Sequence, residues 1–432
     1  MTIIANAPDQ APAPSASAAA AKRRAEARRH YLTGTPGRMR VLAALASLLC
    51  VAFAVTGFLG LRAVDAAVDR ASANTEQVVR VQSIYGDLLK ADAAVTNGFL
   101  VGGLESEKNR LTYDSAMADV ARNIAEAAKA QPADGTALAA LNQAVQGYSN
   151  NIDRARTNNR QAFTVGQQYL KIAGDGLRQT ALPIAANLAS ANEARADDEL
   201  NFAGSGGLVL GMGVLTLGAL VGIGLWLARK THRYVNLPLV GAGVLVAGGL
   251  ALATMHVVDV SSTLIAVKGG NFKAAVSLAG ARAAAFDAKA NESLTLIARG
   301  NGATYEERFL ASADQADKQL DDMLAADTTR TSLKPQFSDY RTLHSKIRDA
   351  DEGGDWNAAV GLATSTASGS ANAVFTTFDE ASGTVLDQLV AGVVKDFNGL
   401  GGRYLPWVLG LGGILAALLA GRSMTNRIEE YR

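Results

Sequence analysis

The sequence predicts an all-α membrane protein with four transmembrane helices and two extracytoplasmic up-down four-helix bundles, arranged as a tandem repeat. Three observations lead to this prediction. Hydrophobic residues make up 49% of the chain and aromatic residues only 6%, a composition that soluble domains rarely have. Four apolar stretches reach the length of about 20 residues that a bilayer-spanning helix needs. The segments between them place apolar residues at alternating steps of three and four, as amphipathic helices do.

The expected transmembrane helices are 41–62, 204–228, 237–258 and 403–421. Lys and Arg gather before the first of them, in the loop 229–236 and in the tail 422–432. Because positively charged loops stay in the cytoplasm, we expect a multi-pass plasma-membrane protein with both termini inside. The long segments 63–203 and 259–402 are then extracytoplasmic.

Residues 1–40 begin with a low-complexity stretch rich in Ala and Pro and end in a basic patch. Such a composition buries too little apolar surface to fold, so we expect a disordered basic cytoplasmic tail. The basic patch serves either as a topogenic signal or as an arm that docks a partner.

The first outer segment contains four helical patterns. The first runs from Arg62 to Leu100 and carries one acid, Asp92, in its apolar stripe. We interpret this acid as solvated by water at a loosely packed interface between helices. The alternative is that it contacts a ligand inside the bundle. Two shorter helices follow, joined by the turn Gln131–Gly135, and a fourth begins near Val165 with an expected kink at Pro183. Helices of these lengths fit an up-down-up-down four-helix bundle, and we expect its long helices to continue into the membrane spans.

The second outer segment repeats the plan of the first. Its first apolar stripe runs from Val276 to Ile297, and further helices are expected to about Ala326 and from Ser332 to Arg348. A long run of small residues then leads to the fourth span. Residue identity between the halves is slight, but the order of elements matches, which indicates a tandem duplication.

Two connections of each bundle are expected to lie together at its membrane-distal tip. Helix capping explains some of their polar residues, but not an arginine beside an aromatic residue, which is typical of a binding hot spot. The first tip is rich in amides, and the second places a tryptophan among acids. The candidate partner-binding residues are Asn158, Asn159, Arg160, Gln161, Phe163, Asp355 and Trp356.

Two further sets of residues are candidates for contacts. Those for a cytoplasmic partner are Arg229, Lys230, His232, Arg233 and Arg427. Small residues spaced four apart allow membrane helices to approach closely. The candidates for such packing are Gly207, Gly211, Gly218 and Gly222 in the second span, with Ala417 and Gly421 in the fourth.

No signature of an enzyme is present. The sequence lacks a nucleophile elbow, a phosphate loop and a dinucleotide fingerprint. One cysteine, Cys50, and four scattered histidines exclude a disulfide framework and give no metal-ligand spacing. The net charge of +1 does not favour nucleic acid. We therefore expect no catalytic residue, no cofactor and no metal.

The stretch "NNRQAFTVGQQYLKIA" at Asn158–Ala173, followed by Leu182–Pro183, resembles the actinobacterial GlnX membrane proteins. The resemblance extends over nearly the full length through the four spans, the two helical outer domains and the short basic loop. It implies an adaptor that relays external aspartate or glutamate status from the periplasmic amino-acid-binding lipoprotein GlnH to the cytosolic Ser/Thr kinase PknG. Two alternatives stay open: a chemoreceptor-like sensor that binds a small ligand directly, and a structural scaffold of a cell-envelope complex.

Overall fold

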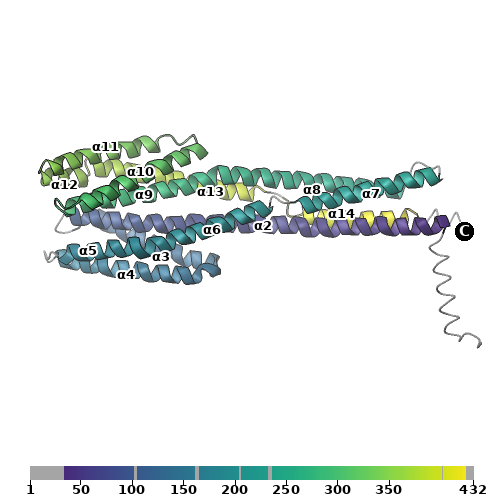
Figure 1. Cartoon of the computed structure of the whole chain (residues 1–432), viewed down its shortest axis with the longest axis horizontal. Helices are drawn as coiled ribbons and strands as arrows, with labels where there is room; N and C mark the ends of the chain where they lie inside the picture. The colour runs from purple at the N-terminus through teal and green to yellow at the C-terminus, as the bar shows by residue number, and fades with distance from the viewer. Residues whose placement is uncertain are drawn as a thin grey trace, which may run out of the picture. The chain divides into compact units, whose positions relative to one another are not determined.

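The computed structural model describes residues 34–101, 105–160, 165–203, 206–231, 236–400 and 402–424 (Figure 1). These residues form helices and connecting turns, without strands. They divide into two compact units. The membrane unit comprises Met1–Val64, Ser205–Val258 and Gly402–Arg432, and the helical unit comprises Asp65–Gly204 and Asp259–Gly401.

Within the described residues, four helices are long and apolar enough to cross a membrane. They are α2 (Gly34–Val101), α7 (Gly207–Thr231), α8 (Leu237–Gly269) and α14 (Leu405–Arg422). Large apolar side chains such as Leu48, Leu208 and Leu411 are exposed. Exposed apolar side chains are expected on these helices, because lipid tails solvate them as well as a protein core does. The prediction of an all-α membrane protein with four spans is confirmed.

Helix α2 is 68 residues long and contributes to both units, since the first span continues into the helical unit without a break. The sequence predicted this continuity. The corresponding junction before the second span, residues 204–205, lies outside the described residues. At the junction after the third span, only Gly270 separates α8 from the next helix.

Small residues do bring membrane helices together, but mostly at positions other than the predicted ones. A Cβ built on Gly413 of α14 would lie 2.6 Å from the Cβ of Ala54 in α2. The predicted pair Ala417 and Gly421 also lies at a helix contact, where the Ser47 hydroxyl donates to the Ala417 carbonyl oxygen at 3.0 Å.

The four glycines predicted in the second span do not pack against another helix in the part of the chain that the structure describes. A Cβ added at any of them meets nothing within 4 Å, because all four lie on the exposed side of α7. These are Gly207, Gly211, Gly218 and Gly222. Gly206 and Gly213 allow the close helix contact instead. A Cβ built on Gly206 would lie 2.5 Å from the Val257 side chain, and one built on Gly213 would lie 2.7 Å from the Leu250 side chain.

Bundle 1 consists of the α2 segment in the helical unit together with the helices up to Ala203. These are α3 (Glu107–Ala130), the 3-10 turn η1 (Pro132–Asp134), α4 (Gly135–Arg160), α5 (Val165–Gly176), the π-helical segment η2 (Leu177–Ala181) and α6 (Leu182–Ala203). The sequence predicted a kink at Pro183. The structure shows π-helical turns directly before it, where proline has no N–H to continue the α-helical bonding.

Bundle 2 consists of five helices. They are α9 (Asn271–Ile297), α10 (Ala303–Ala326), α11 (Leu333–Glu352), α12 (Trp356–Thr364) and α13 (Ala371–Asn398). The predicted long run of small residues is broken between α12 and α13. The Ser370 hydroxyl accepts from the Ala373 N–H at 3.3 Å and donates to the Ser365 carbonyl oxygen at 2.6 Å, which favours a helix start over continuation.

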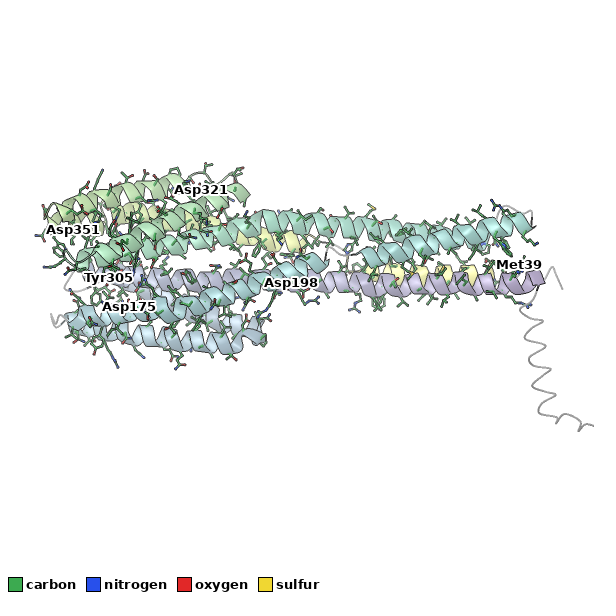
Figure 2. All side chains as sticks on the ribbon, in the orientation of Figure 1. Met39, Asp175, Asp198, Tyr305, Asp321 and Asp351 are labelled. Atoms are coloured by element: carbon green, nitrogen blue, oxygen red, sulfur yellow. The ribbon has the colours of Figure 1, made fainter. Side chains whose placement is uncertain are left out.

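One hydrophobic core extends through both bundles. Bundle 1 contributes aliphatic side chains such as Leu141 and Ile152, whereas bundle 2 contributes the aromatic rings of Phe337, Tyr340 and Phe378. Charged side chains such as those of Asp198 and Asp321 remain exposed (Figure 2). The two bundles therefore form a single packed unit.

We expect Gly413→Ala to destabilise the membrane unit and Gly218→Ala to leave it unchanged or slightly more stable. The methyl group at position 413 has to push α2 and α14 apart, and overpacking of this kind costs about 1–3 kcal/mol. At position 218 the substitution only exchanges glycine for a better helix former, worth about 1 kcal/mol. Thermal unfolding of both full-length variants in one detergent measures this, and equal melting temperatures would contradict the packing.

Candidate functional site

Arg178 joins the two bundles at a buried position. It comes from the π-helical segment of bundle 1, and its guanidinium lies 3.0 Å from Asp92 of α2 and 2.7 Å from Asp287 of α9. Asp92 also accepts a hydrogen bond from the Tyr148 hydroxyl at 3.2 Å. Asp287 in turn accepts from the Ser312 hydroxyl at 2.6 Å. One cation thus holds one carboxylate from each bundle.

The sequence interpretation of Asp92 as a wetted acid is wrong. Its side chain is 1% exposed, and water is replaced by Arg178 and the Tyr148 hydroxyl. Burial raises the pKa of Asp92, and the charge of Arg178 opposes that rise. The acid is tolerated in an apolar stripe because its counter-charge arrives from another helix of the same bundle.

A second set of ion pairs crosses between the bundles farther along α2. The ammonium of Lys90 lies 2.9 Å from a carboxylate oxygen of Asp379 in α13. The other oxygen of Asp379 is 2.6 Å from the guanidinium of Arg282 in α9. Asp379 is therefore neutralised by one cation from each bundle.

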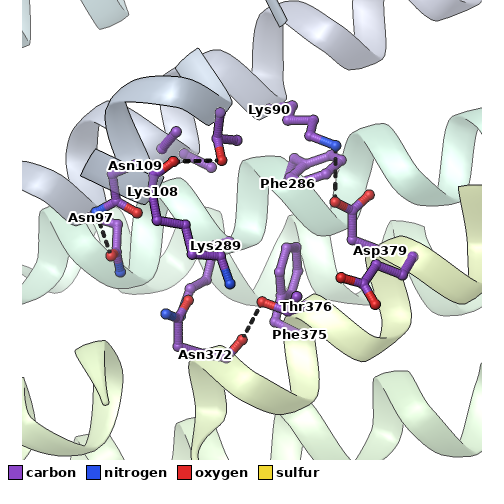
Figure 3. A pocket seen from close by; sticks show the side chains of 14 residues that line it. Lys90, Asn97, Lys108, Asn109, Phe286, Lys289, Asn372, Phe375, Thr376 and Asp379 are labelled. Carbon is purple, nitrogen blue, oxygen red and sulfur yellow. Dashed lines mark hydrogen bonds and ion pairs between the residues drawn. The ribbon is translucent and has the colours of Figure 1, made fainter. Parts of the chain in front are cut away.

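A cavity of about 280 Å³ opens beside this set (Figure 3). Residues of α2 and α3 line it from bundle 1, and residues of α9 and α13 line it from bundle 2. Three of the lining residues, Lys90, Lys108 and Lys289, carry a positive charge. The rings of Phe286 and Phe375, 5.4 Å apart between centroids, form an apolar wall.

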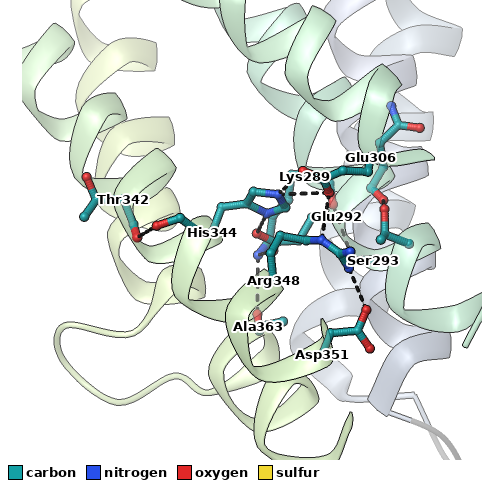
Figure 4. A network of polar contacts seen from close by, with 12 residues as sticks. Lys289, Glu292, Ser293, Glu306, Thr342, His344, Arg348, Asp351 and Ala363 are labelled. Atoms are coloured by element: carbon teal, nitrogen blue, oxygen red, sulfur yellow. Dashed lines mark hydrogen bonds and ion pairs between the residues drawn. The ribbon is translucent and has the colours of Figure 1, made fainter. Parts of the chain in front are cut away.

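Lys289 belongs to a buried polar network inside bundle 2 (Figure 4). Its ammonium lies 2.6 Å from Glu292, which is fully buried. Glu292 also contacts the Nδ1 atom of His344 at 3.0 Å, and the Nε2 atom of His344 lies 3.2 Å from Glu306. The His344 ring stacks on Phe309 with centroids 3.4 Å apart.

The network continues towards the loop before α12. Arg348 lies 3.3 Å from Glu306 and 2.6 Å from Asp351, near the end of α11. Asp351 is four residues before Asp355, which caps α12. Polar contacts therefore run without interruption from the cavity between the bundles to the tip of bundle 2.

The protonation states in this network depend on one another. Burial by itself raises the pKa of Glu292, but the charges and hydrogen bonds of Lys289 and His344 outweigh it and lower the pKa to about 2. Burial also acts to lower the pKa of His344, but its hydrogen bonds to Glu292 and Glu306 outweigh that effect and raise it. The arrangement favours an ionised Glu292 beside a charged His344.

The predicted residues of the first tip lie at the end of α4. Asn158 donates through its amide to the Arg154 carbonyl oxygen at 2.8 Å, while the side chain of Arg160 is exposed. Asn159 is partly buried next to Asn158. Gln161 and Phe163 lie outside the described residues.

The predicted residues of the second tip are held by the fold. The Trp356 indole donates to the Leu296 carbonyl oxygen at 2.8 Å, and the Arg299 guanidinium lies 4.1 Å from its ring centroid. Asp355 caps α12 by accepting from the Ala358 N–H at 2.9 Å. In the described part of the chain, no hydrogen bond or ion pair joins these residues to Asn158–Arg160. The role of both tips in partner binding stays a prediction.

Of the predicted cytoplasmic contacts, Arg229 and Lys230 are exposed near the end of α7. His232, Arg233 and Arg427 lie outside the described residues. The two described residues keep a cationic end on this helix, which suits a contact with an acidic surface.

Sequence reasoning missed the residues that connect the bundles. It also missed the network inside bundle 2, although a signal for part of it existed: Lys289 and Glu292 are three residues apart in an otherwise Ala-rich helix, a spacing that allows an intrahelical ion pair. For Arg178 and Asp287 the sequence offered no comparable signal, since they are 109 residues apart.

Arg178→Met should lower the free energy of unfolding by about 3–5 kcal/mol, since it leaves the buried carboxylate of Asp92 and the partly buried carboxylate of Asp287 without their counter-charge. Methionine retains most of the apolar stem. Arg110→Met is the matched control, because Arg110 contacts Asp114 at 3.7 Å on the surface, where an ion pair contributes about 0–1 kcal/mol. Chemical denaturation of the full chain in detergent compares the two, and an equal loss would rule out a special role for the buried arginine.

The stability of the protein should fall as pH rises past the folded-state pKa of His344. A raised folded-state pKa stabilises the fold below the unfolded value, about 6.5, and that contribution disappears above the folded value. His344→Gln should lack this loss. Burial and then Asp119 raise the pKa of Asp87 to about 7 in both proteins, so the difference between their melting curves isolates His344. Melting temperatures from about pH 5.5 to 8.5 provide the measurement; parallel curves would refute it.

Comparison with known proteins points to a sensor. Residues 67–201 match the family model of an actinobacterial sensor domain. The match begins in α2 and ends in α6, so it covers bundle 1. No curated protein and no solved structure matches the chain. The family match supports an actinobacterial sensor protein whose matched domain is bundle 1.

Proposed function

We propose that this chain is a transmembrane signalling adaptor without catalytic activity. In this proposal the helical unit lies outside the cytoplasm and receives aspartate or glutamate status from a periplasmic amino-acid-binding lipoprotein. The chain then passes that status to a cytosolic Ser/Thr kinase. The sensor-domain match supports a signalling role, and the resemblance of the Asn158–Ala173 stretch to GlnX proteins supports this particular relay.

The observation that carries the proposal is the continuity of α2. One unbroken helix contains the first membrane span, Lys90, which pairs with Asp379 of bundle 2, and Asp92, which holds the arginine that pairs with Asp287 of bundle 2. A helix transmits axial displacement or rotation well, because its backbone hydrogen bonds resist local deformation. A change at the bundle interface therefore has a direct covalent route into the membrane.

Bundle 2 can act on the same helix. The Lys90–Asp379 and Arg178–Asp287 pairs link α13 and α9 to bundle 1 across the shared core. A separate network begins at Lys289, which lines the same cavity as Lys90 and Asp379, and runs to Asp351 towards the tip of bundle 2. Such a contiguous polar network offers a physical basis for coupling between the tip and the bundle interface.

Exposed cations suit the two contacts that an adaptor needs. Arg160 at the end of α4 is exposed and is a candidate contact for the lipoprotein. Arg229 and Lys230 at the end of α7 are candidate contacts for the kinase. Trp356 is anchored by Leu296 and Arg299, so we propose that it shapes the second tip as well as offering surface.

Direct sensing is a second candidate function, favoured by the cavity between the bundles. It is lined by both bundles, so a ligand there would contact both at once. A molecule that fits better in one arrangement of the bundles shifts their equilibrium by its difference in affinity. The same signalling output then follows without a binding protein.

Arg160→Glu should weaken lipoprotein binding about tenfold or more, as charge reversal at a hot spot does. Lys171→Glu is the matched control, because Lys171 is also exposed on bundle 1, forms no ion pair with any described residue, and undergoes the same change in charge. Titration of the lipoprotein against the full chain in nanodiscs measures both affinities. If the two variants bind with equal affinity, docking at the first tip is excluded.

A further inference from the structure

The cavity between the bundles contains a buried donor without a partner. The Nδ2 atom of Asn97 makes no hydrogen bond, although the side chain is only 5% exposed. Its oxygen accepts from the Asn109 amide at 3.2 Å (Figure 3), so the NH₂ group of this cavity-lining residue is the part left without a partner. An unsatisfied buried polar group costs about 1–3 kcal/mol, so a site that retains one gains when an acceptor arrives.

The ammonium groups of the cavity have unused donors as well. Lys289 is 3% exposed and uses two of its three N–H groups, on Glu292 at 2.6 Å and on the Ala363 carbonyl oxygen at 3.3 Å. Within the described residues, Lys108 of α3 makes no ion pair. The residues that line the cavity therefore hold three unused donor groups, one amide and two ammonium groups.

The acidic residues that line the cavity do not neutralise the positive charge of Lys108 and Lys289. Asp379 is already neutralised by Lys90 and Arg282 at 2.9 and 2.6 Å. Glu380 also lines the cavity, but its side chain is exposed to solvent, which screens its charge. The inner part of the cavity thus favours a negatively charged group that accepts hydrogen bonds.

Size and shape restrict the ligand further. A volume of about 280 Å³ suits a small molecule better than a nucleotide or a peptide. The wall formed by Phe286 and Phe375 suits a carbon skeleton rather than a bare inorganic ion. A small ligand with an apolar body and a few fixed polar contacts is typical of such sites.

We propose that this cavity binds a small organic carboxylate, with one carboxylate group held by Asn97, Lys108 and Lys289. The carbon chain lies against Phe286 and Phe375. The ligand contacts α2, α3, α9 and α13, and it takes up the remaining donor of Lys289, the first residue of the network that leads to the tip of bundle 2. This proposal names the ligand class for the direct-sensing candidate and rests on that candidate alone.

Calorimetric titration of the full chain in detergent tests the proposal, with acetate, alanine and succinate as carboxylate probes and with phosphate and sulfate as inorganic ones. We expect saturable binding of at least one carboxylate, weakened about tenfold by Lys108→Ala through loss of a charge-assisted hydrogen bond. Lys129→Ala is the matched control on the same helix α3, where the residue is exposed and outside the cavity. Asn97→Leu should weaken the same binding while keeping the side-chain volume.

Three results would overturn the proposal. The first is that no carboxylate gives a binding heat. The second is that phosphate or sulfate binds as tightly as the best carboxylate, and the third is that Lys108→Ala binds with wild-type affinity. Lys108 is exposed, so this variant is expected to fold, and its melting temperature verifies that. The titration uses neither lipoprotein nor kinase. Failure of the carboxylate site and failure of the adaptor function are therefore separate outcomes.

Discussion

The arrangement of this protein depends on a single cation, Arg178, buried between one carboxylate from each bundle. A buried arginine with two acids is stable only while all three remain in place, because each charge left alone loses its hydration without compensation. That condition couples the packing of bundle 1 to the packing of bundle 2. It also explains how a chain rich in alanine, with few large side chains to interlock, fixes one register between two bundles. The Lys90–Asp379–Arg282 set imposes the same requirement farther along α2.

Hydropathy and periodicity were sufficient for the spans, the helical unit and the continuity of α2, because those features depend on averages over many residues. The contacts between bundles could not be predicted in this way. Lys90 and Asp379 are 289 residues apart, and only the mutual rotation of two bundles decides that they meet. The prediction that the glycines of the second span pack against another helix was wrong for a related reason. A spacing of four defines a helix face but not whether a partner covers it, and the face of Gly218 is exposed while Gly213 is packed. Trp356 looked available in sequence, yet the Leu296 carbonyl oxygen holds its indole.

The two functional candidates use the same structural connections from opposite ends. A protein docked at the tip of bundle 2 would act first on Arg348 and His344 and only then on Lys289. A carboxylate in the cavity would act first on Lys289. Because Glu292 is shared between Lys289 and His344, neither event can change one partner without changing the electrostatic environment of the other. Both inputs therefore converge on the interface between the bundles, where α2 makes its contacts.

The π-helical segment before Pro183 has a consequence for how the fourth helix of bundle 1 is built. A π turn holds one residue more than an α turn, so it behaves as a one-residue insertion and advances the following helix by about 100°. Arg178, near the start of this segment, meets Asp92 and Asp287, and Arg195, beyond its end, meets Asp134 at 2.8 Å. In a regular α-helix of the same residues, the angle between these two arginines about the helix axis would differ by about 100°. The π-helical segment thus sets the angle between the two ionic contacts about the helix axis. Deleting a single residue within Leu177–Ala181 would change this angle, and the helix could then no longer make both contacts in their present geometry.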